Sequence, residues 1–496
     1  MNVDRSAGVL VHPTSLPGPF GCGDLGPSAV RFLDWAAEAG LSVWQILPLG
    51  PTGPGASPYD CESAFAGNPL LISLERLVHS GLLPSRSLDS LPESTEERAD
   101  FDLVSRVKNR CLRDSWERFR RSAAEETRRE LDAFIDHPGS KPWLEDWSLY
   151  AALKDRHGGA SWLEWDEDLR LRRPPAVRSA ARDLRHEIAY QRYVQFLFQR
   201  QWHGVRRAAH RRGIALYGDL PFYVAHDSAD VWSHRELFRL DEDGRASKVA
   251  GVPPDYFSET GQRWGNPVYR WDRLAERGHD WWIERIRANL RFVDLLRLDH
   301  FRGFAAYWEI DADAATAVGG RWTPGPGRSL FDAIRGVLGN LPLVAEDLGL
   351  ITPEVETLRD ELGLPGMHVL QFGFGDEDSV HHPSRHRENA VVYTGTHDND
   401  TLRGWFDDLE PSTQDRVLSY LGCGPGEVAW RMLEQAYRSP ARLAIVPLQD
   451  LLGLGSEARM NVPGVKSNNW RWRVRALRLT LELAAELRAL RRDCCR

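Results

Sequence analysis

Eight short apolar runs, each followed by polar residues, glycine or proline, constrain the fold of this chain more than any other feature. Each run is long enough for one buried strand and too short for a helix that packs against a core. The runs are Gly8–Val11, Val43–Leu47, Ile214–Tyr217, Val293–Leu298, Leu341–Ala345, Met367–Phe372, Ala390–Tyr393 and Leu443–Val446. Helical patterns lie between most of them, at 28–39, 281–291, 329–338, 353–362, 411–421 and 474–491. Alternating strands and helices predict a parallel sheet, and eight such units predict a closed (β/α)₈ TIM barrel of the α/β class.

Two gaps between the runs are too long for simple connections and predict insertions. The longer gap becomes charged and helical after Asp100, so we expect residues 61–205 to form a mainly helical insertion. The first part of the barrel would then occupy 1–60 and the rest 206–496. The second gap, at about 221–280, contains the stretch Gly251–Pro267, which is rich in proline, glycine and aromatic residues and lacks regular periodicity. Long stretches of this kind predict a loop-rich insertion with a function of its own.

Charge and cysteine content exclude several classes of protein. The net charge is −8, from 71 acidic and 63 basic residues, which argues against a nucleic-acid binder. No signal-peptide core lies at the start, and no run of 18 apolar residues exists, so we expect no association with a membrane. The 6 cysteines are scattered and form no Cys-x-x-Cys pair, which favours the reducing cytoplasm over a disulfide-forming compartment.

The fourth apolar run ends in a charged pair that is a candidate for catalysis. Arg297 and Asp299 are two residues apart, so they point to the same face of a strand. A neighbouring cation favours the ionised form of a carboxylate, and we expect Asp299 to be charged at neutral pH. A fixed, ionised carboxylate at a strand end is suited to act as a nucleophile. The alternative is a structural Arg–Asp pair at the start of a loop.

The fifth run ends in two further acids, Glu346 and Asp347. Glu346 follows apolar residues, and partial loss of solvent is expected to raise its pKa, as a general acid requires. Asp347 points to the opposite face if the strand continues. The alternative is that both acids belong to a helix start before Pro353.

A third acid, Asp398, follows the seventh run in the sequence His397-Asp398-Asn399-Asp400. Such a sequence contains metal-binding side chains, but no further oxygen ligands stand at a fixed spacing, so we expect no metal. Three acids at the ends of three barrel strands fit cleavage of a glycosidic bond through a covalent glycosyl-enzyme.

At this level of detail the chain resembles the amylomaltase or 4-α-glucanotransferase family, the disproportionating enzymes of the α-amylase superfamily. The resemblance extends over nearly the whole chain and is weakest in the helical insertion. The motifs that carry it are His12–Pro17, Trp44–Pro51, Ser57–Tyr59, Gly218–Val224, Gly251–Pro267, Arg297–Gly303, Ala345–Gly349, Gly395–Thr401, Arg459–Gly464 and Asn469–Arg473.

The resemblance implies roles for individual residues. Asp299 would be the nucleophile, Glu346 the acid/base and Asp398 the stabiliser of the transition state, with Arg297 and His397 beside them. The other predicted substrate-binding residues are Tyr59, Ser57, Asp219, Gln262, Trp264, Asp347 and Asn461. The implied substrates are malto-oligosaccharides and α-1,4-glucans, and the family uses no metal or organic cofactor. It also lacks a separate C-terminal β-domain. We further expect a monomer or weak homo-oligomer.

Two other functions share these residues. An α-1,4-glucan hydrolase would use the same three acids, and a barrel without activity could bind glucan. An inactive relative would be expected to have lost an acid, yet all three are present. The aromatic residues Tyr256, Phe257 and Trp264 could cover the site and exclude water, which favours transfer over hydrolysis.

Overall fold

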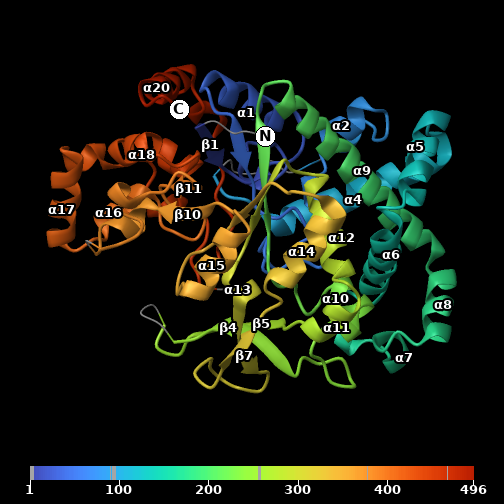
Figure 1. The fold of residues 1–496 in the computed structure, drawn as a ribbon. Coiled ribbons are helices and arrows are strands. Elements are labelled where there is room, and N and C mark those ends of the chain that lie inside the picture. The colour runs from blue at the N-terminus through green and yellow to red at the C-terminus, as the bar shows by residue number, and fades with distance from the viewer. Residues whose placement is uncertain (1–4, 90, 92–96, 255–257, 377, 466) are drawn as a thin grey trace.

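The computed structural model describes residues 5–89, 91, 97–254, 258–376, 378–465 and 467–496. Its centre is a parallel sheet of eight strands in the order β10-β11-β12-β1-β2-β3-β6-β9. All eight apolar runs contribute a strand, so the predicted (β/α)₈ barrel is confirmed (Figure 1). The strands are β1 Ser6–Leu10, β2 Val43–Gln45, β3 Ala215–Leu220, β6 Leu295–Leu298, β9 Leu343–Ala345, β10 Gly366–Val369, β11 Ala390–Tyr393 and β12 Leu443–Pro447.

The two outermost strands of this order, β9 and β10, meet and close the barrel. The Ala345 amide donates a hydrogen bond of 2.8 Å to the Pro365 carbonyl just before β10. Strands β10, β11 and β12 are buried along their entire length, which explains why they read as continuous apolar runs and not as alternating patterns. The sixth run extends beyond its strand, since residues 370–373 form a turn of 3₁₀ helix.

Helices surround the barrel, and most start close to the predicted positions. The last helix, α20, is an exception: it begins at Leu481 and not at 474. The Thr480 hydroxyl accepts a hydrogen bond of 3.2 Å from the Leu483 amide and so caps the helix there. The helices of the barrel and its loops are α1 Pro27–Glu38, α10 Ala229–Ser233, α11 Trp271–Glu276, α12 Asp280–Leu290, α13 Arg302–Ala305, α14 Arg328–Leu338, α15 Pro353–Glu361, α16 Leu402–Asp407, α17 Pro411–Leu421, α18 Val428–Arg438, α19 Leu448–Leu451 and α20 Leu481–Asp493.

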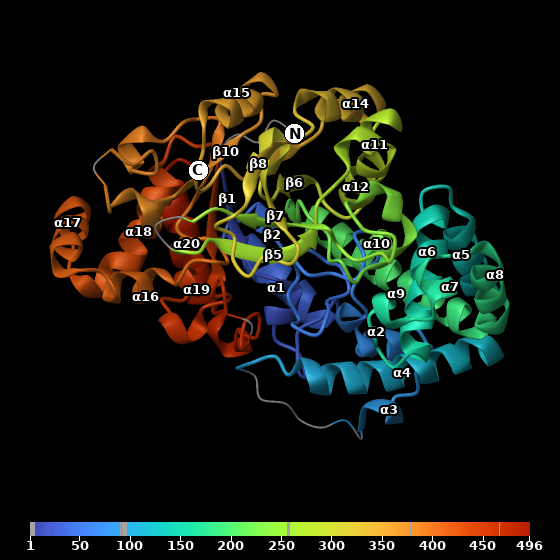
Figure 2. The same ribbon diagram turned by 90° about the horizontal axis from the view of Figure 1, so that it is seen from below.

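Among the described residues, eight α-helices lie between β2 and β3, on the side of the barrel opposite to α16–α18 (Figures 1 and 2). Two glutamines of α9 fix this segment to the chain that follows β2. The Gln195 side chain bonds both the amide and the carbonyl of Gly67, at 2.8 and 2.9 Å. Gln201 does the same to Ser73, at 2.7 and 3.1 Å. The helices are α2 Leu74–His79, α3 Arg86–Asp89, α4 Phe101–Ser122, α5 Glu125–Asp136, α6 Lys141–Arg156, α7 Glu167–Arg170, α8 Pro174–Asp183 and α9 Arg185–His210.

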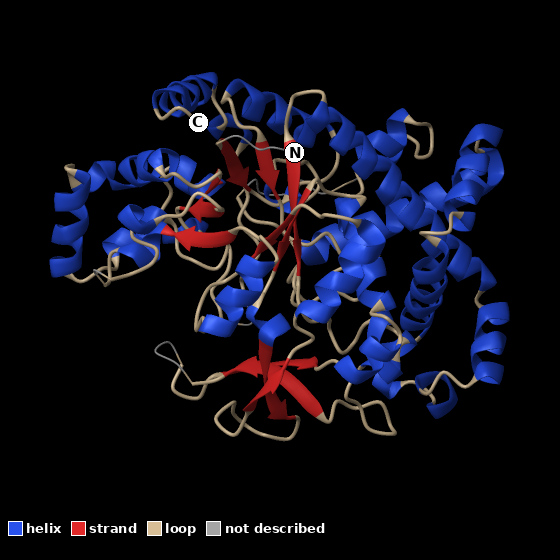
Figure 3. Cartoon of the chain, in the orientation of Figure 1, coloured by secondary structure: helices blue, strands red, loops and turns tan. Residues whose placement is uncertain are grey.

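A second, antiparallel sheet lies apart from the barrel, as Figure 3 shows. Its order is β5-β4-β7-β8, with bounds β4 Lys248–Val252, β5 Gln262–Pro267, β7 Ala306–Asp311 and β8 Arg321–Pro324. Strands β4 and β5 therefore occupy part of the stretch that was expected to be loop-rich. Glycine and proline within β4 and β5 weaken the alternating pattern by which strands are recognised. Within the described residues, no helix combines the length and apolar character needed to cross a bilayer.

Candidate active site

The side chains of Asp219, Arg297 and Asp299 form a charged cluster at the ends of β3 and β6. Asp219 and Arg297 are direct partners in the parallel register of the two strands, so their side chains emerge side by side. One guanidinium nitrogen of Arg297 lies 2.8 and 2.7 Å from the two Asp219 oxygens and 3.0 Å from Oδ1 of Asp299. Asp219 and Arg297 are buried, whereas Asp299 keeps 26% of its side chain exposed. Asp299 is thus the member of this cluster that a substrate can reach, and the buried Asp219–Arg297 pair holds its carboxylate in place.

Glu346 emerges from the next strand, beside Asp299. Backbone bonding continues past the strand ends, because the Asp299 amide donates to Leu220 and the Glu346 amide donates to Leu298. The Glu346 carboxylate accepts hydrogen bonds from the amides of His300 (2.7 Å) and Leu348 (3.0 Å). Loss of solvent raises the pKa of Glu346 to about 8, with Arg297 opposing this shift and the Asp299 charge adding to it. The shift agrees in direction with the prediction from sequence, and it favours the protonated form of Glu346.

Asp398 lies in the loop after β11, and groups from distant parts of the chain hold it. Its Oδ1 accepts a hydrogen bond of 2.6 Å from Nδ2 of Asn461, and its carbonyl accepts one of 2.8 Å from Arg459. Nε2 of His397 is 3.5 Å from its Oδ2. About half of the Asp398 side chain, 48%, is exposed, so the carboxylate remains available to a ligand.

Tyr59 joins these groups from the loop after β2. Its hydroxyl donates a hydrogen bond of 2.8 Å to Oδ2 of Asp219, and its ring stacks on the His397 ring with the ring centres 5.0 Å apart. Ser57 supports Tyr59 by accepting a hydrogen bond of 3.2 Å from its amide. Tyr59 therefore connects the Asp219–Arg297 pair to the loop that carries Asp398.

Two predicted binding residues of the antiparallel sheet, Gln262 and Trp264, reach the barrel. The Trp264 indole nitrogen donates to the Gln262 side chain at 3.1 Å. The Trp264 ring meets the His300 ring edge-on, 5.1 Å between centres, next to Asp299, and 40% of Trp264 is exposed. An exposed indole against His300, the residue that follows Asp299 in the chain, presents a flat apolar face to a ligand. The other two aromatic residues predicted to cover the site, Tyr256 and Phe257, lie outside the described residues.

The Asp347 side chain points away from this cluster, in the direction that strand alternation indicated. The resemblance had instead implied that Asp347 binds the substrate. Its Oδ1 accepts a hydrogen bond of 2.7 Å from the Met367 amide of β10. Its Oδ2 is paired with Arg359 of α15 and lies 3.7 Å from Arg387. Both oxygens therefore bind groups of β10 and α15 where β9 and β10 meet, and the substrate-binding role of Asp347 that the resemblance implies stays a prediction.

Two residues that hold the acids were not singled out from the sequence. His300 has φ of 49°, a left-handed conformation that is unusual outside glycine, and its amide is the donor to Glu346. Arg459 binds the Asp398 carbonyl. Both belong to motifs that carried the family resemblance, but their roles depend on backbone geometry, for which a sequence pattern gives no signal.

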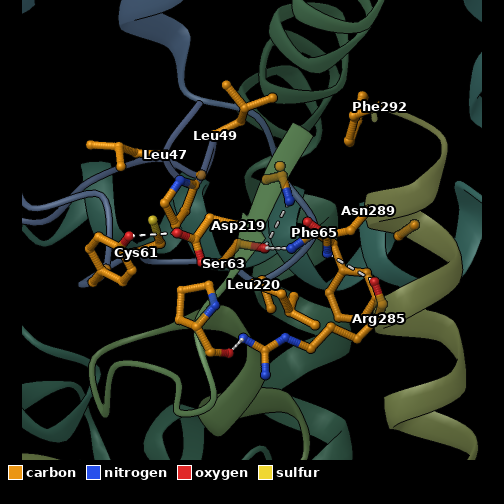
Figure 4. Close-up of a pocket in the computed structure, with 18 of the residues that line it drawn as sticks. Leu47, Leu49, Cys61, Ser63, Phe65, Asp219, Leu220, Arg285, Asn289 and Phe292 are labelled. Atoms are coloured by element: carbon orange, nitrogen blue, oxygen red, sulfur yellow. Dashed lines mark hydrogen bonds between the residues drawn. The ribbon is translucent and has the colours of Figure 1, made fainter. Parts of the chain in front are cut away.

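A cavity of about 50 Å³ lies behind the site, between the loop after β2 and helix α12 (Figure 4). Asp219 and Tyr59 line it, whereas Asp299, Glu346 and Asp398 do not. The buried Arg285 guanidinium crosses this region and donates hydrogen bonds to the carbonyls of Pro221 (2.7 Å) and Phe222 (3.1 Å). The cavity therefore adjoins the groups that fix the loop after β3, and the three acids are not among the residues that line it.

The arrangement combines an ion-paired carboxylate, a buried carboxyl group of raised pKa beside it and a third, accessible carboxylate. This set can perform nucleophilic attack, proton transfer and stabilisation of positive charge on one sugar. Among the described residues, no group of three or more His, Cys, Asp or Glu side chains could hold a metal ion.

Comparisons with known proteins agree with this chemistry. A family model described as 4-alpha-glucanotransferase matches residues 11–480. A 4-alpha-glucanotransferase of Synechocystis is 51% identical over 95% of this chain and 94% of its own length. One of Thermus thermophilus is 48% identical over 99% of each chain. The structure of an amylomaltase from Streptococcus agalactiae, in complex with acarbose, has a TM-score of 0.96 at 37% identity and covers 99% of both chains. The chain therefore belongs to the 4-alpha-glucanotransferase family, whose members are glucan-transferring enzymes.

Proposed function

We propose that this chain moves segments of α-1,4-glucan from a donor malto-oligosaccharide to the 4-hydroxyl of an acceptor glucan or glucose. The reaction would be a retaining double displacement, in which two inversions at one anomeric carbon restore the α configuration. The observation that carries this proposal is the pairing of Asp299, held by Arg297 at 3.0 Å, with Glu346, whose pKa is raised to about 8. The two neighbouring acids thus have different surroundings, since Asp299 is ion-paired and partly exposed whereas burial favours the protonated form of Glu346.

In the first half-reaction, an Asp299 oxygen attacks the anomeric carbon and forms an ester. The bond from this carbon to the glycosidic oxygen breaks, and the proton of Glu346 passes to that oxygen. The leaving glucan departs with a free 4-hydroxyl group. Arg297 holds the attacking carboxylate in position, and Asp219 fixes Arg297 from behind through both of its oxygens.

In the second half-reaction, Glu346 is a carboxylate and accepts the proton of the acceptor's 4-hydroxyl. The acceptor oxygen attacks the anomeric carbon, the ester bond to Asp299 breaks, and both acids return to their starting state. The raised pKa of Glu346 suits this exchange, since the group must release and regain one proton in each cycle.

Asp398 and His397 would bind the sugar at the cleaved bond. The Asp398 carboxylate is accessible and can bind sugar hydroxyls while it stabilises the positive charge that develops in the transition state. The Streptococcus agalactiae relative forms a complex with acarbose, which supports the proposal that this chain also binds oligosaccharides. Tyr59 and Trp264 provide the aromatic faces of this groove.

A trapped intermediate tests the proposal. A 5-fluoro-α-glycosyl fluoride donor forms a glycosyl-enzyme that turns over slowly, and digestion with mass spectrometry identifies the labelled residue. We expect the label on Asp299, and no label in Asp299→Asn. Labelling of another carboxylate in the native protein would overturn the assignment.

We also propose that the protein works in a reducing compartment, the cytoplasm. All 6 cysteines are free thiols, and those at positions 22, 111 and 494 are buried. An oxidising compartment usually selects for disulfides or for few cysteines. Fractionation of the cells that produce the protein would test this point.

A further inference from the structure

Asp450 is a buried carboxylate that contacts the Asp398 loop at both of its ends. It lies in α19, directly after β12, and is only 6% exposed. Its Oδ2 accepts a hydrogen bond of 2.7 Å from the Thr394 hydroxyl. Its Oδ1 accepts one of 2.8 Å from the Leu402 amide. Thr394 is the first residue after β11, and Leu402 is the first residue of α16, so one side chain joins the two anchors of the segment 394–402.

Hydrogen bonds from within the segment and from Gln371 hold its interior. Oδ1 of Asn399 accepts hydrogen bonds from the amide and the hydroxyl of Thr396, both at 2.9 Å. Gln371 donates to the Asp400 carbonyl at 2.8 Å. The loop is thus held within itself and by Gln371, Arg459 and Asn461, and Asp450 adds the contacts at its two ends.

We propose that Asp450 is a positioning residue for the transfer reaction. By holding both ends of the segment 394–402, it keeps the Asp398 carboxylate and the His397 ring in place at the bond that is cleaved. A carboxylate suits this position because both of its partners are donors and an ionised carboxylate only accepts. The inference rests on the proposed role of Asp398.

The surroundings of Asp450 influence its charge. A cavity of about 20 Å³ beside it is lined by the charged or titratable groups His12, His397, Asp400 and Arg459. Burial raises the pKa of Asp450 to about 7; the hydrogen bonds from Leu402 and Thr394 oppose this shift, and the Asp400 charge adds to it. The carboxylate therefore titrates near neutral pH, and an asparagine at this position would not.

Three variants test the proposal. Asp450→Ala removes both hydrogen bonds, whereas Asp450→Asn can still accept from Leu402 and donate to the Thr394 hydroxyl. Asp294→Ala is the matched control: Asp294 accepts from the Leu216 amide at 2.9 Å and pairs with Arg206 at 2.6 Å, just before β6 at the far end of the barrel. Each variant is measured as kcat per active site, with active sites counted by the 5-fluoro donor, so that misfolded protein does not contribute.

We expect kcat per active site to fall about tenfold or more in Asp450→Ala, because a small misplacement of a catalytic group is costly. Asp450→Asn should recover the rate to within about threefold and remove the part of the pH profile near pH 7. The control should lose stability and keep its kcat per active site. A normal kcat per active site in Asp450→Ala would overturn the proposal.

A double-mutant cycle with Asp398→Asn gives the second readout. With an α-maltosyl fluoride donor, whose good leaving group keeps slow variants measurable, Asp450→Ala should add little to the loss caused by Asp398→Asn. Additive losses would mean that Asp450 does not act through Asp398. A fully active Asp398→Asn would instead contradict the proposed role of Asp398, so the two failures can be told apart.

Thr394→Val provides a test if Asp450→Ala does not fold. Valine has nearly the shape of threonine and removes only the bond to Oδ2. We expect about a threefold loss of kcat per active site, equivalent to a weakened hydrogen bond. An unchanged value would overturn the proposal.

Discussion

Two regions form the candidate active site, and they hold their side chains in different ways. At the ends of β3 and β6, the Arg297 guanidinium is buried and shared between Asp219 and Asp299. On the antiparallel sheet, Trp264 is 40% exposed and is held by one hydrogen bond to Gln262 and by an edge contact with His300. The first region is rigid through buried charge, and the second is a surface that a ligand can cover.

This difference indicates that the two regions have different functions in the reaction. Charges that stabilise a transition state must be fixed before the reaction, and buried ion pairs achieve this. A surface that accepts sugars of different length needs contact area more than exact placement. We therefore expect changes at the strand ends to affect bond cleavage, and changes on the antiparallel sheet to affect the choice between water and sugar as acceptor.

Asp299→Asn should reduce the rate of bond cleavage more than any other change. A small reduction would contradict the catalytic role that we assign to the strand ends. An amide cannot form the glycosyl ester, so the rate of donor cleavage should fall by about 10⁴-fold or more while glucan binding is retained. Initial rates with maltotriose and calorimetric binding of acarbose measure the two quantities. Asp294→Asn, on the same segment but at the other end of the barrel, should keep its activity. Near-native turnover by Asp299→Asn, free of deamidated protein, would remove Asp299 from the mechanism.

Glu346→Gln should have the next largest effect. Loss of a general acid typically costs about 10²–10⁴-fold. The first step should suffer much less with an α-maltosyl fluoride donor, because fluoride needs little help from an acid. Comparison of the glycosylation rates for the two donors checks this expectation. Equal losses on both donors would show that Glu346 is not the proton donor.

The pH dependence of kcat/KM in the native protein also tests the role of Glu346 as the proton donor. In the proposed mechanism the first step requires protonated Glu346, and burial raises the pKa of this group to about 8. Above this pH the protonated fraction falls, so kcat/KM should decrease by about tenfold per pH unit on the alkaline side. A profile of kcat/KM from pH 5 to 10, in buffers of constant ionic strength, measures this limb. An alkaline limb that persists unchanged in Glu346→Gln would belong to another group.

Trp264→Ala should have the smallest effect on the rate of cleavage. It tests whether the antiparallel sheet affects the choice of acceptor. We expect donor cleavage to stay within about threefold, because no catalytic group is lost. The ratio of hydrolysis to transfer should rise severalfold, since a flat apolar surface for the acceptor sugar is removed. Trp308→Ala is the control: this second indole of the sheet is bonded to the Ala317 carbonyl and packs on Trp322. An unchanged ratio in folded Trp264→Ala would show that Trp264 only packs the sheet.

The barrel and the three acids were predictable because they depend on local pattern. A strand buried on both faces must be a continuous apolar run, and in a barrel of parallel strands the residues that follow such runs gather at one end. Asp299, Glu346 and Asp398 occupy those positions. Strand alternation also indicated the direction in which the Asp347 side chain points, whereas the role in the groove that the resemblance implies stays a prediction.

Other features depend on contacts between distant segments, which a single sequence does not reveal. Tyr59 and Asp219 are 160 positions apart and share a hydrogen bond, and the Asp450 contacts join loops that follow two different strands. The antiparallel sheet was missed because β4 and β5 contain glycine or proline, and because β7 and β8 come from a different part of the chain. The left-handed backbone of His300 gave no signal either.

Incubation of the protein with maltotriose alone tests the central claim most directly. Transfer requires that a sugar hydroxyl outcompete bulk water, and positioning of the acceptor can contribute about 7–11 kcal/mol toward this. Products resolved by chain length should be glucose and a ladder of longer α-1,4-glucans, with almost no increase in reducing ends, because each bond broken is replaced by one formed. If reducing ends increase in step with the loss of maltotriose and no product exceeds the donor in length, the enzyme is a hydrolase and the account is contradicted.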